Sequence, residues 1–476
     1  MFETGIRQFR MAMGMVWGKR LDARNIERLL QDALATIAEF GEPGADARQL
    51  IDGPLTDPKA RLDFATRGVR RTAARLAEQS PFYSRRFEAA GVRPDKLDVE
   101  GLGAIPVTVK RDLVERPDDF QCRDVTPYLA TRTTGTTGQP AEVWLSRYEM
   151  ELWPAIGTLG SILRDDLRPS DVMQVSISSR ATAAVHLDVA CARLVGAACT
   201  VLGIVPPDVT LDSLCARGVT IMETIPSYLG ELEAAARRRG LGPKDFRLRR
   251  IDVGGEVLSP SLEAAVLETF GVAVNDLFGM TEVVPVTGRT CSHRHLHHDI
   301  NMGLVEYLDL ETGEPAEPGA LATVVVTPYF PYRDCMPVFR YDTRDVVRRL
   351  PDEPLDCEIA GLPGVSRIVG KADQLLRLGP DDVVTPRQII DAIEALPDRP
   401  WPARYRATVH NGRIALTLPK SAIAGIGEQE AARHFADHDL DCELAFVGDD
   451  EAPSLRLLRS DLHETTFAAR PALIGA

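Results

Sequence analysis

A short segment rich in threonine and glycine is the part of the sequence best suited to bind phosphate. It reads Thr-Arg-Thr-Thr-Gly-Thr-Thr-Gly-Gln-Pro over residues 131–140. Glycines let the backbone approach a polyphosphate and direct its amides at the oxygens, and the hydroxyl groups add donors. The spacing is not the Walker pattern, because no lysine follows the second glycine. The alternative interpretation is an ordinary threonine–glycine hairpin turn.

A second segment has the composition of a metal site. Residues 291–299 read Cys-Ser-His-Arg-His-Leu-His-His-Asp, so thiol, imidazole and carboxylate ligands lie within nine positions. Thiolate and imidazole are the ligands that zinc prefers, and a structural zinc site needs four of them. The alternative is a solvated histidine-rich loop.

Alternating apolar runs and helical patterns from about residue 170 predict the elements that position these segments. Strands are expected at 172–177, 198–204, 220–223, 248–253 and 273–278, and helices at 184–194, 211–217, 228–239 and 262–269. This alternation predicts a mostly parallel sheet covered by helices. Residues 302–310 and 320–328 predict a β-hairpin region, and helices are expected over 21–42 and 63–79.

The chain beyond about Gly370 has the pattern of a small α+β unit. Asn411-Gly412 separates two alternating apolar runs and predicts a hairpin, with helices expected on either side. The predicted fold class is therefore α/β: a large domain (1–369) of mixed and parallel sheets with helices and a β-rich subdomain, followed by a small α+β C-terminal lid domain (370–476).

Composition limits the classes of partner. The chain has 476 residues and a formal net charge of −14, which argues against broad binding to nucleic acid or to anionic membranes. It contains no apolar run near the roughly 18 residues of a membrane helix, and its first residues lack a secretion signal, so we expect a cytoplasmic protein. The oligomeric state stays open, with a homodimer as one option.

Five motifs occur in the order found in adenylate-forming enzymes, the superfamily of acyl-coenzyme A synthetases. The threonine–glycine segment is followed by Gly254-Gly255-Glu256, Phe278-Gly279-Met280-Thr281-Glu282, Arg340 to Asp345 and Gly370-Lys371-Ala372-Asp373. The segments 81–92 and 106–113 resemble the phenylacetate–coenzyme A ligase group within that superfamily. The resemblance covers residues from about 63 to 395.

The resemblance implies a role for each motif in attack by a carboxylate on the α-phosphate of ATP. Glu282 would ligate Mg²⁺, Thr281 would contact the α-phosphate, and Asp345 would accept both ribose hydroxyls. Lys371 would lie at the hinge before the lid. The β- and γ-phosphates would be held by Thr133, Thr134, Gly135, Thr136, Thr137 and Gly138. The adenine pocket would be lined by Gly255, Glu256, Asp276, Phe278, Gly279 and Met280.

By the same resemblance, the acyl substrate would lie between Tyr228, Gly254 and the region of His186. A structural zinc would be held by Cys291, His297 and Cys357, because Cys291 and His297 match the spacing of the group. Relatives carry a further late cysteine that is missing here, and Cys335, His298 or Asp299 are the available substitutes. For His186, an ordinary helix histidine is an equal alternative.

The sequence departs from the superfamily at the lid. Relatives carry a C-terminal lysine that reaches the α-phosphate, whereas residues 449–476 contain no lysine. Arg456 and Lys420 are the substitutes that the sequence offers, although a guanidinium fork is not equivalent to a compact ammonium. Arg344 also stands where relatives have glycine.

The predicted function is ATP-dependent activation of a carboxylic acid, most readily an aromatic one, to an acyl-adenylate, with transfer to the thiol of coenzyme A. Two alternatives stay open. The acyl group could pass to an amine or to a carrier-protein thiol, or the chain could be a weakened nucleotide- or acyl-binding homologue.

Overall fold

A mixed sheet flanked by helices organises the larger part of the chain. The computed structural model describes residues 20–40, 57–133, 140–178, 182–351, 355–359, 361–379, 382–397 and 400–451. Within these residues the largest sheet has the strand order β13-β9-β8-β7-β6-β5-β3-β4. Its strands are β3 (Val172–Val175), β4 (Ala198–Val201), β5 (Ile221–Thr224), β6 (Arg250–Gly254), β7 (Val274–Phe278), β8 (Gly288–Thr290), β9 (His295–His298) and β13 (Gly364–Ser366).

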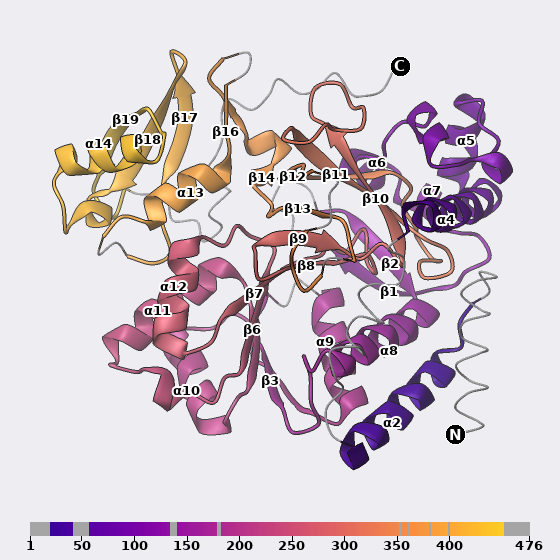
Figure 1. Ribbon diagram of the computed structural model, residues 1–476, viewed down its shortest axis with the longest axis horizontal. Helices are drawn as coiled ribbons and strands as arrows, with labels where there is room; N and C mark the ends of the chain where they lie inside the picture. Colours follow the sequence, from indigo (N-terminus) through magenta and orange to yellow (C-terminus); the bar gives the residue numbers. More distant parts are fainter. Residues whose placement is uncertain are drawn as a thin grey trace.

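The five strands from β4 to β7 run parallel, and β8, β9 and β13 extend the sheet antiparallel. Parallel strands need crossover connections, and helices provide them here. Two helix layers cover the faces (Figure 1). One layer is α2 (Ala23–Phe40), α8 (Arg147–Leu163) and α9 (Thr182–Val195), and the other is α10 (Pro207–Arg217), α11 (Pro226–Arg238) and α12 (Pro260–Phe270).

The two layers bury separate hydrophobic clusters, one against β3 and one against β5, β6 and β7. The sequence signals at the helix ends explain their bounds. Ser146 caps α8 and pairs with Glu149 in a capping box, and Ser259 caps α12 before Pro260. Gly271 ends α12 with a φ of +74°, a left-handed conformation that favours glycine.

A second sheet and a set of four helices form the β-rich part beside the main sheet. The sheet has the order β10-β11-β12-β14 and is antiparallel throughout. Its strands are β10 (Gly303–Asp309), β11 (Leu321–Pro328), β12 (Tyr341–Arg348) and β14 (Gly370–Lys371), and β1 (Pro127–Arg132) pairs with β2 (Glu142–Ser146) as a separate hairpin. The helices beside them are the long α4 (Pro58–Gln79) and the shorter α5 (Pro81–Ala89), α6 (Lys110–Glu115) and α7 (Pro117–Phe120).

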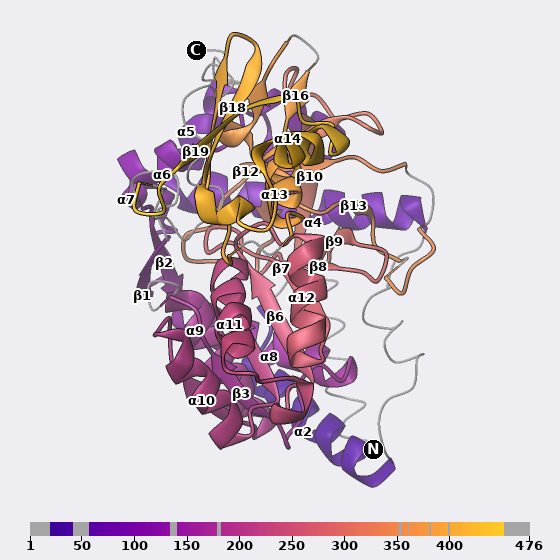
Figure 2. The same cartoon turned by 90° about the vertical axis from the view of Figure 1, so that its left-hand side faces the viewer.

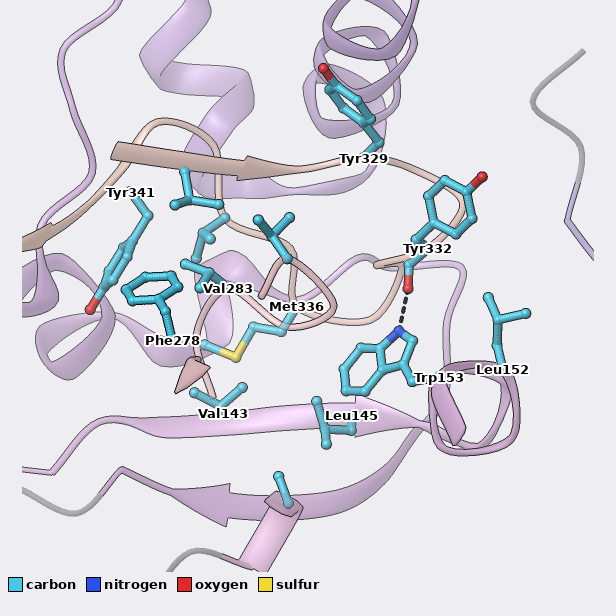
Figure 3. Close-up of a cluster of buried hydrophobic side chains, with 14 of the residues drawn as sticks. Val143, Leu145, Leu152, Trp153, Phe278, Val283, Tyr329, Tyr332, Met336 and Tyr341 are labelled. Atoms are coloured by element: carbon cyan, nitrogen blue, oxygen red, sulfur yellow. Dashed lines mark hydrogen bonds between the residues drawn. The ribbon is translucent and has the colours of Figure 1, made fainter. Parts of the chain in front are cut away.

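A buried hydrophobic cluster that includes several aromatic rings joins these parts (Figure 3). Trp153 of α8 donates its indole N–H to the backbone oxygen of Tyr332 at 2.6 Å. Phe278 at the end of β7 and Tyr341 at the start of β12 belong to the same cluster. Truncating one such aromatic ring typically costs about 3–5 kcal/mol. The cluster therefore fixes the end of β7 relative to β12.

The C-terminal unit has its own core and packs beside α12 (Figures 1 and 2). It contains β15 (Leu376–Arg377), β16 (Val383–Val384), α13 (Pro386–Glu394), β17 (Arg406–His410), β18 (Arg413–Pro419), α14 (Glu428–Asp437) and β19 (Cys442–Val447). β14 still pairs with the larger part of the chain, whereas the separate core contains residues from Leu376 onward together with Val257. The predicted domain boundary between residues 369 and 370 stays a prediction. In the described part of the chain, every helix is too short or too polar to cross a membrane.

Candidate active site

A cavity of about 970 Å³ opens at the carboxyl ends of the parallel strands. Residues that follow β3, β5, β6 and β7 line one side, and residues of α6, β12 and the link after β14 line the other. Ligands of parallel α/β sheets bind in this position, because the loops that follow the strands gather there. The cavity therefore contains residues from every described motif singled out in the sequence.

Glu282 lies on the wall of this cavity just after β7 and is 3% exposed. Its carboxylate accepts a hydrogen bond of 3.3 Å from the hydroxyl of Tyr341. Burial raises the pKa of Glu282, and the positive charges of Lys110 and Lys371 act against that rise. Thr281 lines the same wall. A buried carboxylate facing a cavity with cations nearby is suited to hold a cation or to stay charged beside phosphate.

Asp345 lies on β12 directly opposite Lys371 of β14. The Lys371 ammonium is 2.8 Å from a carboxylate oxygen of Asp345 and donates a 3.0 Å hydrogen bond to the backbone oxygen of Thr343. Both side chains are buried and line the cavity. Lys371 therefore does more than mark a hinge, because it neutralises the carboxylate predicted to bind the ribose.

Lys110 is a site residue to which sequence reasoning gave no role. Lys110 begins α6. Two positions earlier, Thr108 forms a β-bridge with Tyr341. The backbone N–H of Thr108 donates to Arg340 at 2.7 Å, and its backbone oxygen accepts from Asp342 at 2.9 Å. Its ammonium lines the cavity and interacts electrostatically with Glu282. Burial lowers the pKa of Lys110, and the charge of Glu282 opposes that shift. Because lysines are scarce in this chain, the position of Lys110 could have been weighed from sequence as a substitute for the missing lid lysine.

The predicted adenine wall lies on the cavity. Gly254, Gly255 and Glu256 follow β6, and they line the cavity together with Asp276, Phe278, Gly279 and Met280. A Cβ on Gly254 would approach the backbone oxygen of Leu277 to 2.8 Å, and Gly255 has a φ of +81°, so glycine is required at both positions. The Glu256 carboxylate accepts the Ser227 N–H at 2.8 Å, which fixes the start of α11. Burial raises the pKa of Asp276 to about 6.

The phosphate loop is described only at its edges. Thr133 lines the cavity, and it exchanges hydrogen bonds of 3.0 Å with the backbone of Ala141, which closes the β1–β2 hairpin. Residues 134–139, which include Thr134, Gly135, Thr136, Thr137 and Gly138, lie outside the described residues. Their predicted contact with phosphate stays a prediction.

Three predicted site residues lie away from the cavity. Tyr228 is 1% exposed, and its hydroxyl bonds to Thr210 and to the backbone oxygen of Val205, both at 2.6 Å, so it is a core residue of α11. His186 is exposed on α9, and it is Ala183, Ala184 and Leu187 that face the cavity. The interpretation of Tyr228 and His186 as substrate contacts is corrected accordingly. Lys420 is exposed and lies outside the cavity lining, and Arg456 lies outside the described residues.

Comparison with known proteins agrees with this geometry. Residues 58–320 match the family model described as AMP-binding enzyme, which is more than half of the chain. The chain belongs to the AMP-binding enzyme family. The prediction of the adenylate-forming superfamily from five motifs is thereby confirmed.

Two relatives of this AMP-binding enzyme are phenylacetate–coenzyme A ligases. The enzyme of Pseudomonas putida is 26% identical over 321 residues, which cover 62% of this chain and 67% of the relative. The enzyme of Thermus thermophilus is 25% identical over 348 residues, which cover 69% and 74%. A solved 2-hydroxyisobutyryl-CoA ligase, in its postadenylation state with R3-HIB-AMP, is 19% identical with a TM-score of 0.72 and covers 85% of this chain and 90% of its own. That likeness confirms the α/β fold.

Four possible metal ligands gather at the hairpin of β8 and β9 in this AMP-binding enzyme. One side-chain ligand atom each from Cys291, His295 and His297 lies within 4.8 Å of the others. The sulfur of Cys357 is 3.5 Å from Nε2 of His297 and also interacts with Cys291. Nδ1 of His297 lies 3.1 Å from the backbone oxygen of Leu362, which leaves Nε2 as the lone-pair nitrogen that faces the thiols.

The prediction of Cys335 as a ligand is corrected. Cys335 is fully buried beside α8, where its backbone N–H donates to Glu149 at 3.1 Å and its oxygen accepts from Cys122 at 2.8 Å. His295 takes its place in the cluster. Side chains alternate along a strand, so His295 and His297 of β9 share one face while His298 points to the other and contacts Tyr307. That alternation was visible in the sequence.

Proposed function

We propose that this AMP-binding enzyme activates a carboxylic acid with ATP and then transfers the acyl group to coenzyme A. The observation that carries the proposal is the convergence of Glu282, Asp345, Lys110 and Lys371 on one cavity beside the Gly254–Gly255 wall. In the first step a carboxylate oxygen bonds to the α-phosphorus and pyrophosphate leaves. In the second step the thiolate sulfur bonds to the acyl carbon and AMP leaves.

Charge neutralisation is the main task in the first step, because an anion attacks an anion. The buried carboxylate of Glu282 is suited to hold Mg²⁺, which when bound would screen the phosphate oxygens. Lys110 supplies an ammonium from the larger domain at the same place, so we assign it the phosphate-binding charge that relatives carry on the lid. Asp345 accepts the ribose hydroxyls, with Lys371 holding its carboxylate in position.

The acid is aromatic in this proposal, because the relatives matched over most of their length carry the name phenylacetate–coenzyme A ligase. The apolar part of the cavity agrees with a ring, since Ala184, Leu187, Ile225 and Val253 line it. The link that follows β14 would allow the C-terminal unit to change its position between the two steps.

The test is release of pyrophosphate with a panel of aromatic and aliphatic acids, with and without coenzyme A. We expect pyrophosphate without coenzyme A and thioester only after its addition. An adenylate that forms but yields no thioester would assign the acyl group to another acceptor. No pyrophosphate with any acid of the panel would overturn the proposal.

We also propose that the cluster at β8 and β9 binds a structural zinc ion through Cys291, His295, His297 and Cys357. The donor set fits, because two thiols and two imidazoles match a tetrahedral Cys₂His₂ site. Nδ1 of His295 is buried and makes no hydrogen bond among the described residues, as expected of a group that needs a further partner. Glu358 accepts hydrogen bonds from the N–H and the hydroxyl of Ser292, at 2.7 and 2.6 Å, which ties the late loop to the hairpin.

Metal analysis of the purified protein tests the zinc site. We expect about one zinc per chain, and loss of zinc with a lower melting temperature in His295→Ala and Cys291→Ser. Cys215→Ser is the matched control, because Cys215 is exposed and distant in sequence, and it should keep its zinc. A metal-free wild-type protein that unfolds at the same temperature after zinc addition would contradict the assignment.

A further inference from the structure

Two acidic side chains face each other at the acyl end of the cavity. Asp188 comes from α9 and Glu223 from β5, and both line the cavity. Sheet register places Glu223 beside Asp252 of β6, and Asp252 beside Asn275 of β7. β5 is two strands away from β7, so Glu223 lies roughly 10 Å from the strand that leads to Glu282. The acidic pair therefore lies apart from the reacting groups, within reach of the far end of an aromatic acid.

Among the described residues, no basic side chain forms an ion pair with Asp188 or Glu223. The carboxyl groups of Asp188 and Glu223 interact with each other, and among the described residues Arg250 is the basic group whose charge acts on Glu223. Arg250 is already engaged, because its guanidinium donates to Asp252 at 2.8 Å and to Asp166. Oδ2 of Asp188 is buried and has no hydrogen-bond partner among the described residues. A buried acceptor without a donor is costly, so this oxygen is suited to receive a donor from a ligand.

The protonation of the pair agrees with this interpretation. Burial raises the pKa of Asp188 to about 7, and burial together with the charge of Asp188 raises the pKa of Glu223 well above its usual value. Two interacting carboxyl groups lose their protons in two steps, so the pair retains a proton to a higher pH than an isolated carboxyl group does. The remaining lone pairs accept hydrogen bonds.

We propose that the substrate of this enzyme is an aromatic carboxylic acid that carries an amino group, which donates hydrogen bonds to the Asp188–Glu223 pair. The inference rests on the proposed function and names its substrate class. An amine offers two or three donors to two acceptor groups, whereas a hydroxyl offers one. A second carboxylate would be repelled by the pair. A methyl group would leave the buried oxygen of Asp188 without a partner.

The experiment compares acids that differ only at the far end. Rates of pyrophosphate release are measured for 4-aminobenzoate, 3-aminobenzoate, 4-aminophenylacetate and the corresponding methyl-substituted acids. We expect at least one amino-substituted acid of this set to have a kcat/KM about 10–100-fold above that of its methyl-substituted counterpart. Loss of a hydrogen bond to a charged group has an effect of this size. Asp188→Asn and Glu223→Gln should reduce that ratio toward one, because each removes an acceptor for the amino group.

The control and the outcomes separate this inference from the proposed function. Asp212→Asn removes the same charge from an exposed position and should keep the wild-type ratio. If the methyl-substituted acids react and none of the amino-substituted acids has a higher kcat/KM than its methyl counterpart, the inference is overturned while the proposed function stands. If no acid reacts at all, the proposed function itself has failed. The wild-type comparison decides the matter even where a variant does not fold.

Discussion

The buried carboxylates at the two ends of the cavity have different charged neighbours. At the reacting end, Glu282 lies near Lys110, and Asp345 forms an ion pair with Lys371. At the acyl end, the carboxyl groups of Asp188 and Glu223 interact mainly with each other. The same chemical group thus lies beside a cation in one place and beside a second carboxyl group in the other.

The difference teaches what each end is built to bind. Carboxylates matched by ammonium groups leave a site near neutrality, into which magnesium and a polyphosphate can enter together. At the acyl end, Oδ2 of Asp188 has no hydrogen-bond donor among the described residues. The nucleotide end therefore requires balanced charge, and the acyl end requires a donor from the substrate.

The largest expected effect is at the reacting end. Glu282→Gln keeps the shape of the side chain and removes its charge, so we expect the rate of pyrophosphate release to fall roughly 10³-fold or more for every acid. The ratio between amino and methyl acids should not change. Circular dichroism checks that the fold is kept. A variant with near wild-type rates would remove Glu282 from the magnesium role and break the comparison.

The next effect concerns the source of the phosphate-binding charge. Lys110→Ala should lower kcat/KM about 10²-fold, because the cavity loses a preorganised ammonium. Lys420→Ala is the matched control, since Lys420 is exposed and lies outside the cavity lining, and it should keep full activity. The opposite result, a loss with Lys420→Ala alone, would show that the C-terminal unit supplies the charge after all.

Most of the fold could be predicted from the sequence because its parallel strands and helices carry strong local signals. The strands predicted at 220–223 and 248–253 occur as β5 and β6, shifted by one or two residues, and the hairpin at Asn411–Gly412 occurs as β17–β18. The antiparallel extension by β8, β9 and β13 was not predicted, because these strands are only three or four residues long. Short strands of that kind are fixed by tertiary contacts rather than by periodicity.

Site residues that belong to a sequence motif could be predicted, whereas site residues that only the fold brings together could not. Glu282 and Asp345 stand in recognisable segments, and both lie on the cavity. Asp188 and Glu223 belong to an ordinary helix and strand, and only sheet register and packing bring them together. Tyr228 was misassigned because Pro226-Ser227-Tyr228 begins a helix that turns its tyrosine into the core.

A smaller effect tests the acyl end through stability. In the unfolded chain the pKa of an aspartate is near 3.8, and in the folded protein burial raises the pKa of Asp188 to about 7. Between these pH values the folded protein binds a proton that the unfolded chain has released. The contribution of Asp188 to the free energy of unfolding is therefore present at low pH and is lost as pH rises toward 7. Asp188→Asn stays neutral and should lack this loss.

The measurement is the free energy of unfolding in urea at several pH values between 4 and 8. The difference between Asp188→Asn and wild type should move in favour of the variant by up to about 1 kcal/mol per pH unit, and less outside that window. Glu282→Gln serves as the comparison at the reacting end. A difference for Asp188→Asn that does not vary with pH would show that the pair does not share a proton, which would remove the contrast between the two ends.

The smallest expected effect concerns Arg344, a basic residue at the reacting end whose backbone is strained. Arg344 lines the cavity with a φ of +62°, and its N–H donates to Asp342 at 2.9 Å. Because a left-handed conformation costs a non-glycine residue about 1 kcal/mol or more, Arg344→Gly should raise stability by about that amount or less. If the guanidinium also reaches phosphate, the KM for ATP should rise a few-fold while the ratio between amino and methyl acids stays fixed. An altered ratio would mean that the two ends of the cavity are not independent.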